Sequence, residues 1–161
     1  MTEWADLMGA EALGSIAGKI RPVSALIVES MDRLPLGNEK RQAVAYHYPC
    51  HLLGQGEADS SVRMLQALPG IDLQVLDSGC CGMAGSWGLH ADHDGLSRQI
   101  GRGLVECLAA AQAGTAATDC PTCRLQMEQL GPTPVRHPVE IVADRLERSV
   151  GIGIERGRLS R

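Results

Sequence analysis

Five of the six cysteines in this 161-residue chain stand in three short segments that suit metal–sulfur chemistry. Cys50 follows a proline, and Cys80 and Cys81 are adjacent and flanked by glycines. Further along, Cys120 and Cys123 form a C-x-x-C motif. Thiolate sulfur is a soft ligand that selects zinc, copper(I) or iron–sulfur clusters. We therefore interpret these five cysteines as one candidate ligand set.

The adjacent pair is the most informative part of this set. Neighbouring residues in an extended segment point to opposite sides, so Cys80 and Cys81 do not easily face one tetrahedral zinc together. They suit two different irons of one cluster better. Five thiolates also exceed the four expected for a tetrahedral zinc or a simple cubane cluster. Gly79, Gly82 and Gly85 fit a loop that folds closely over sulfur, because glycine allows left-handed backbone angles.

Three interpretations of the cysteines stay open at this point. The first is an iron–sulfur site built from all five. The second is a structural zinc site made of the C-x-x-C motif and two of the remaining cysteines. The third is a dithiol redox site of the thioredoxin type at Cys120 and Cys123, since this motif follows an expected strand and opens an expected helix.

Other chemically active side chains are assigned supporting roles. Cys107 lies in the middle of an expected helix without partner spacing, so we expect it to pack in the core as a small apolar residue. His47 and His51 flank Cys50, and we expect them to pack against sulfur or donate hydrogen bonds to it rather than to bind metal. His137 precedes a proline and is expected to cap a helix or line the rim of the site.

The elements that position the cysteines form a repeating pattern of strand, cysteine-bearing loop and helix. Expected strands cover 42–47, 71–76 and 115–118, and expected helices cover 57–68, 92–112, 120–129 and 137–146. This alternation predicts an α/β fold: a small, mostly parallel sheet flanked by helices in Rossmann-like βαβ units. The carboxyl ends of parallel strands share one edge, where ligands bind in open α/β folds. All five cysteines should therefore meet at that edge.

The pattern divides the chain into three parts. Residues 1–35 are expected to form an N-terminal helical segment with helices over 3–18 and 23–34. Residues 36–147 are expected to form a cysteine-rich domain, an iron–sulfur domain under the first of the three interpretations, and 148–161 read as a flexible basic tail.

Composition restricts the function further. The formal net charge of −4 gives no support to nucleic-acid binding. No apolar run approaches the roughly 20 residues that span a bilayer, and the first residues lack the basic start of a signal peptide. We therefore expect a cytoplasmic protein. In that reducing compartment, clustered cysteines more often bind metal or do redox chemistry than form structural disulfides.

The cysteine segments resemble a known family. The matching segments are YHYPCH at 46–51, DSGCCGMAGSWG at 77–88, TDCPTC at 118–123 and HP at 137–138. Together they resemble the cysteine-rich (CCG) domain, over about residues 22–147. This domain occurs in the B subunit of heterodisulfide reductase, in the glycolate oxidase iron–sulfur subunit, in the C subunit of anaerobic glycerol-3-phosphate dehydrogenase and in FAD-linked D-lactate dehydrogenase-like oxidases.

The resemblance implies electron transfer. Carried over by position, the ligands of a 4Fe–4S cluster would be Cys50, Cys80, Cys81, Cys120 and Cys123, with the non-cubane form known from heterodisulfide reductase; some family copies bind zinc instead. Relatives pass electrons from a flavoprotein to a quinone or a disulfide. The implied partners are a flavoprotein that carries FAD and a ferredoxin-like iron–sulfur module, with peripheral association at the inner face of a membrane through these partners.

The chain departs from the family pattern in two ways. It has one such domain where many relatives have two, and it lacks the C-x-x-C-x-x-C-x-x-x-C-P run of the ferredoxin-like module. It also shows no flavin or nicotinamide motif. We therefore expect a fragment or a separately encoded C-terminal domain, which is part of an oxidoreductase but not catalytic alone.

Overall fold

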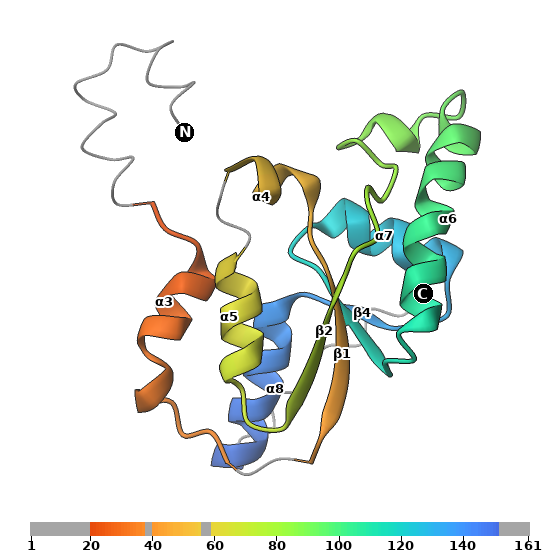
Figure 1. Ribbon diagram of the computed structural model, residues 1–161. Helices are drawn as coiled ribbons and strands as arrows, with labels where there is room; N and C mark the ends of the chain where they lie inside the picture. The colour runs from red at the N-terminus through yellow and green to blue at the C-terminus, as the bar shows by residue number, and fades with distance from the viewer. Residues whose placement is uncertain (1–19, 38–39, 56–58, 152–161) are drawn as a thin grey trace, which may run out of the picture.

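The computed structural model describes residues 20–37, 40–55 and 59–151, and a parallel β-sheet lies at its centre (Figure 1). Within these residues the strand order is β2-β1-β3-β4, and every pairing is parallel. The strands are β1 (Gln42–His47), β2 (Ile71–Leu76), β3 (Thr115–Ala117) and β4 (Val135–Arg136). The predicted α/β class with a parallel sheet is confirmed.

Strand β1 decides which loops become neighbours. It pairs with β2 on one side and with β3 on the other, so that Tyr46 lies opposite both Val75 and Ala117. The loops that follow these three strands therefore leave the sheet side by side at its carboxyl edge. These are the loops that carry the five cysteines of the candidate ligand set, as the sequence predicted.

Helices cover both faces of the sheet (Figure 1). One face is covered by α3 (Val23–Glu29), α5 (Asp59–Ala67) and α8 (Pro138–Val150), and the other by α6 (Asp94–Ala110) and α7 (Pro121–Leu130). A short helix, α4 (Cys50–Gln55), lies at the carboxyl edge directly after β1. Among the described residues, none of these helices is long and apolar enough to cross a membrane.

Successive side chains of β1 point to opposite faces of the sheet and belong to two separate parts of the core. Val44 and Tyr46 pack on the side of α5 and α8, whereas Ala45 packs on the side of α6 and α7. Successive side chains of a strand point to opposite faces, so this division follows directly from the strand. Three buried cysteines belong to the core on the α6 and α7 side: Cys81, Cys120 and Cys123.

The N-terminal helices depart in part from the prediction. The helix expected over 23–34 ends at Glu29, and a 3₁₀ turn over Met31–Arg33 follows it. Ile27 and Val28 nevertheless pack against the same core as α5 and α8. The helix expected over 3–18 lies outside the described residues.

Two short elements were missed. The segment after Pro49 lies between the expected strand over 42–47 and the expected helix over 57–68, but it forms α4, in which Leu53 is exposed and gives no periodic apolar signal. The two residues of β4 lie between the helices expected over 120–129 and 137–146, where no strand was predicted. They become a strand because β3 offers a parallel partner, a contact that the local sequence does not reveal.

Two helix ends also differ. Helix α6 stops at Ala110, two residues before the expected end at 112, and Gln112 takes up left-handed backbone after it, with φ of 50°. Helix α8 continues to Val150, four residues beyond the expected end at Leu146 and into the segment read as a tail. It ends where Gly151, at φ 68°, supplies the left-handed cap that favours glycine.

Candidate metal–sulfur centre

Each cysteine of the candidate set lies just after a strand. Cys50 begins α4 after β1, and Cys80 and Cys81 lie in the loop after β2. Cys120 caps the N-terminus of α7 after β3, and Cys123 stands in its first turn, with Pro121 at the first helical position, which tolerates proline. The three loops thus bring five thiols to one edge of the sheet.

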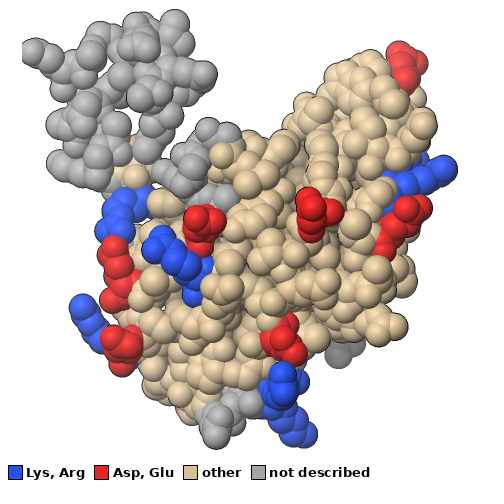
Figure 2. All heavy atoms as spheres, in the orientation of Figure 1, with Lys and Arg blue, Asp and Glu red and all other residues tan. Residues whose placement is uncertain are grey.

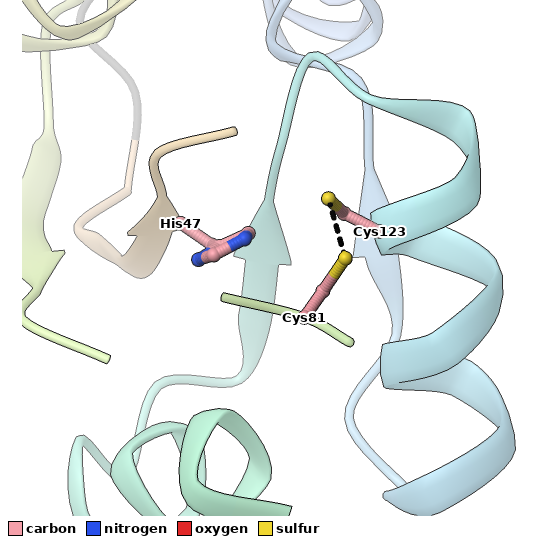
Figure 3. Close-up of side chains that lie close together, drawn as sticks. All are labelled: His47, Cys81 and Cys123. Atoms are coloured by element: carbon pink, nitrogen blue, oxygen red, sulfur yellow. Dashed lines mark hydrogen bonds between the residues drawn. The ribbon is translucent and has the colours of Figure 1, made fainter. Parts of the chain in front are cut away.

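The inner part of this cluster consists of Cys81, Cys120 and Cys123. The Sγ of Cys123 donates a hydrogen bond to the Sγ of Cys81 across 3.0 Å (Figure 3). Both side chains are 3% exposed, and Cys120 is 9% exposed. Cys120 also interacts electrostatically with Cys123. Cys123 therefore links Cys81 and Cys120 within one buried group of thiols.

The outer part consists of Cys50 and Cys80, which are both exposed. These two side chains interact with each other, and both line a hollow of about 550 Å³ beside Val75 and Ser78. Cys80 therefore faces outward while its neighbour Cys81 faces inward, as the alternation of an extended segment predicts.

Ionisation of the inner pair is strongly coupled. The hydrogen bond from Cys123 is the main cause that lowers the pKa of Cys81 to about 4, and the nearby imidazole of His47 and the backbone N–H of Met83 act in the same direction. The same hydrogen bond, with burial, raises the pKa of Cys123. The two thiols thus share one proton: the first leaves readily and the second is held, because two thiolates in contact repel each other.

The thiol of Cys80, in the outer part of the cluster, loses its proton less readily than an ordinary cysteine. Although Cys80 is exposed, partial desolvation by its surroundings is the main cause that raises the pKa of its thiol, and the neighbouring sulfur atoms of Cys81 and Cys50 act in the same direction. The backbone N–H of Gly82, 3.3 Å from Cys80 Sγ, partly offsets this. Hydrogen bonds from backbone N–H groups to Cys80 and Cys81 are the kind that stabilise thiolate ligands.

The loop between the cysteines depends on Gly82. Its φ of 88° lies in the left-handed region that L side chains avoid. A Cβ at this position would stand 2.2 Å from the backbone oxygen of Ser97 on α6. No side chain larger than hydrogen fits there, so α6 and the cysteine loop can pack in direct contact.

A polar clamp from α6 and α7 holds this contact in place. Gln126 on α7 donates from Nε2 to the backbone oxygen of Ser97 at 3.0 Å and to its Oγ at 3.2 Å. The Ser97 hydroxyl in turn donates to the sulfur of Met83, next to the glycine loop. Sequence reasoning missed this clamp; the small residues Ser97 and Gly101, one turn apart on α6, are the signal that could have indicated it.

Asp119 anchors the C-x-x-C loop from the other face of the sheet, on the side of α5 and α8. Its carboxylate accepts hydrogen bonds from the Tyr46 hydroxyl at 2.5 Å and the Ser61 hydroxyl at 2.7 Å. His137 Nε2 lies 3.7 Å from the same group. Burial first, and then the nearby carboxylate, raises the pKa of Tyr46, so its hydroxyl stays protonated and keeps donating. This network fixes the residue that directly precedes Cys120.

His137 fulfils its predicted role as a helix cap. Its Nδ1 accepts from the backbone N–H of Val139, while Glu140 accepts from the backbone N–H of His137, which completes a capping box for α8. His137 also lines a second hollow of about 310 Å³, together with His51 and Asp119. This hollow lies on the α3 and α5 side, where Ser24 and Ser60 form part of its wall.

His47 joins the buried sulfur atoms more closely than its sequence position suggested. Within the described part of the chain, His47, Cys81 and Cys123 form the group whose ligand atoms could hold a metal ion, all within 4.8 Å of one another.

Cys107 lies outside this group and outside the candidate ligand set. It is half-buried rather than part of the core, and its thiol donates to the backbone oxygen of Asp77 at 3.8 Å, because α6 packs along the end of β2.

These features fit a metal–sulfur group. The donor set is soft, with five thiols and an imidazole, and the inner thiol pair already loses one proton readily. Backbone N–H groups of Gly82 and Met83 point at sulfur. A ring nitrogen of His47, Nε2, is buried and has no hydrogen-bond partner among the described residues.

Comparison with known proteins identifies the family. The family model of the cysteine-rich domain, CCG, matches residues 44–128, which include all five cysteines of the candidate set. This chain belongs to the CCG cysteine-rich domain family. The CCG match begins within β1 and ends within α7, so it covers the three cysteine loops and the strands before them.

Curated relatives of this CCG domain are much longer proteins. The chain is 36% identical over 103 residues to the C subunit of anaerobic glycerol-3-phosphate dehydrogenase from Escherichia coli strains K12 and O157:H7, covering 64% of this chain and 26% of that protein. It is 30% identical over 156 residues to the glycolate oxidase iron–sulfur subunit of Escherichia coli K12, covering 91% of this chain and 37% of that subunit. The chain thus spans between 26% and 37% of the length of these relatives.

Proposed function

We propose that this chain is the iron–sulfur electron-transfer domain of a flavin-linked dehydrogenase or oxidase. Cys50, Cys80, Cys81, Cys120 and Cys123 would hold a 4Fe–4S cluster, in a non-cubane form because five thiolates exceed the four of a cubane. When bound, such a cluster supplies one-electron redox chemistry. The observation that carries the proposal is the 3.0 Å contact between Cys81 and Cys123, which joins two of the three cysteine loops.

The protein's own residues would do three things for the cluster. The buried side chains around Cys81 and Cys123 exclude water from one side of the site. Backbone N–H groups of Gly82 and Met83 stabilise negative charge on sulfur. Asp119, held by Tyr46 and other donors, fixes the loop that carries Cys120.

The partners are proposed by analogy with the relatives, whose names are those of a dehydrogenase subunit and of an oxidase iron–sulfur subunit. We propose a flavoprotein that carries FAD as electron donor, a ferredoxin-like iron–sulfur module beside it, and a quinone or a disulfide as acceptor. The location would be cytoplasmic, at the inner face of the membrane through these partners.

A zinc site is the second candidate, because His47, Cys81 and Cys123 offer the nitrogen and sulfur ligands that zinc prefers. It would leave Cys50 and Cys80 without a role. The dithiol alternative has less support. Reactive cysteines of that type need access to a substrate, whereas Cys120 and Cys123 are both buried and Cys123 is engaged with Cys81.

Metal and sulfide analysis of anaerobically reconstituted protein tests the proposal. We expect iron and sulfide near four each per chain, as in a four-iron cluster. The double substitution Cys80→Ser and Cys81→Ser should remove both, while Cys107→Ser should leave them unchanged because Cys107 lies outside the set. One tightly held zinc without iron would favour the zinc site instead. Reduction of a disulfide substrate that survives the double substitution would favour the dithiol site.

A further inference from the structure

The imidazole of His47 occupies a position that packing alone does not explain. It is 1% exposed, and a ring nitrogen lies within 4.8 Å of the sulfur atoms of both Cys81 and Cys123. Figure 3 shows the ring reaching from the end of β1 toward the side on which these two sulfur atoms face each other. A buried polar ring is normally hydrogen-bonded at both nitrogens or placed to bind a ligand.

The two ring nitrogens of His47 differ. Nδ1 lies 3.1 Å from the hydroxyl oxygen of Ser78, two residues before Cys80. Nε2 has no hydrogen-bond partner within the part of the chain that the structure describes. When the Ser78 hydroxyl donates to Nδ1, the neutral ring carries its hydrogen on Nε2. The nitrogen without a partner is then an N–H donor on a ring that lies close to the sulfur atoms of Cys81 and Cys123.

We propose that His47 is a positioning residue that donates a hydrogen bond from Nε2 to sulfur of the bound group and thereby raises its reduction potential. This inference rests on the proposed iron–sulfur function. Reduction adds negative charge that is spread over the sulfur atoms, and an N–H donor stabilises the reduced form more than the oxidised form. Hydrogen bonds to sulfur are among the features that set cluster potentials.

A role as an iron ligand is the opposing interpretation. It would require the hydrogen on Nδ1, donated to Ser78, with the lone pair of Nε2 directed at iron. The donor role is favoured because the five thiols already exceed the ligand number of a simple cluster.

Two substitutions at His47 separate the hydrogen bond from the bulk of the ring. His47→Leu fills similar space without a donor, whereas His47→Gln keeps an N–H near the position of Nε2. In redox titrations of the reconstituted chain, we expect His47→Leu to change the ratio of oxidised to reduced cluster about tenfold at a given potential, a fall of about 59 mV for one electron. His47→Gln should stay close to the wild type.

His51→Leu is the matched control. His51 directly follows Cys50 of the set, but it is exposed and lies outside the group formed by His47, Cys81 and Cys123. We expect its potential shift to be much smaller than that of His47→Leu. Equal shifts would overturn the inference, because they would reflect a general loss of local polarity.

The iron and sulfide content of each variant keeps the outcomes distinct. A wild-type chain without iron overturns the proposed function and this inference together. A loaded wild type with an unchanged potential in His47→Leu overturns the inference alone. Strong nitrogen coupling in pulsed electron paramagnetic resonance that His47→Leu removes would also overturn it, since it would mark an iron ligand. If His47→Leu fails to hold iron, Ser78→Ala provides the test instead. We expect this variant to lower the reduction potential of the cluster, because the Ser78 hydroxyl no longer fixes the tautomer of His47. An unchanged reduction potential overturns the inference.

Discussion

The Sγ atoms of Cys81 and Cys123 lie 3.0 Å apart although 42 positions separate the two residues in the sequence. The contact joins the glycine loop after β2 to the first turn of α7, and both thiols are buried. The contact couples the ionisation of the two thiols, and the effect of this coupling on stability can be measured in the metal-free protein.

The shared proton makes the stability of the reduced, metal-free protein depend on pH. The pKa of Cys81 falls from the ordinary 9.0 to about 4 on folding, so its contribution is present above 9.0 and lost as pH falls toward 4. The pKa of Cys123 is raised, so its contribution is present below 9.0 and lost as pH rises further. We expect the free energy of unfolding to rise from about pH 4 to a maximum near pH 9 and then fall, as measured by urea denaturation.

The same experiment on two serine variants isolates the pair. Cys81→Ser should flatten the rise between acid and neutral pH, whereas Cys107→Ser should keep the wild-type profile. A free energy of unfolding that does not vary with pH in the wild type would contradict the shared proton.

Accessibility should separate the two parts of the cysteine cluster. In the reduced, metal-free chain, a thiol-alkylating reagent should modify the exposed Cys50 and Cys80 well before the three buried cysteines. Mass spectrometry of peptides after timed labelling gives the order. Loading the metal group should protect both outer thiols. Early labelling of Cys123 would show that the inner pair is open to solvent and that the described packing is wrong.

Substitutions at two glycines of the same loop should differ in cost. Gly82→Ala adds left-handed strain of about 1–2 kcal/mol and an overlap with the Ser97 backbone oxygen at 2.2 Å. Overpacking of this kind costs about 1–3 kcal/mol more. Gly79→Ala has a similar φ of 65° but nothing within 4 Å of the added Cβ, so strain alone applies. Chemical denaturation of both variants tests this, and equal losses would show that Ser97 moves aside easily.

Asp119 should matter more to stability than an exposed aspartate. Removing its charge with Asp119→Asn weakens the hydrogen bonds from Tyr46 and Ser61, each of a kind worth about 1.5–3 kcal/mol. Asp94→Asn removes an exposed pair with Arg98, which contributes about 0–1 kcal/mol. We expect Asp119→Asn to destabilise the chain by about 2 kcal/mol in thermal or urea unfolding. A loss no larger than that of Asp94→Asn would mean that Asp119 is not an anchor.

Local patterns were sufficient for the elements that present the cysteines. The strands at 42–47 and 71–76 have the bounds that their apolar runs predicted, because each is flanked by turn residues. The meeting of the cysteine loops at the carboxyl edge followed from the order of strands and helices. It needed no knowledge of side-chain contacts.

What the sequence could not provide depends on contacts between distant segments. The pairing of Cys81 with Cys123, rather than with Cys120, depends on the path of the loop through Gly82, which α6 determines. The anchoring of Asp119 by Tyr46 requires β1 and β3 to be neighbours. Short elements such as β4 exist because of their partners and leave no periodic signal of their own.

The opposite orientations of Cys80 and Cys81 have a consequence for the proposed electron transfer. A cofactor shared by both sulfur atoms would lie across the boundary of the protein, insulated by packed side chains on one side and close to solvent on the other. On the front of the molecule, much of the surface carries neither acidic nor basic side chains (Figure 2). Because tunnelling rates fall steeply with distance, a redox protein that docks over Cys80 would exchange electrons with such a cofactor far faster than one that docks behind the helices.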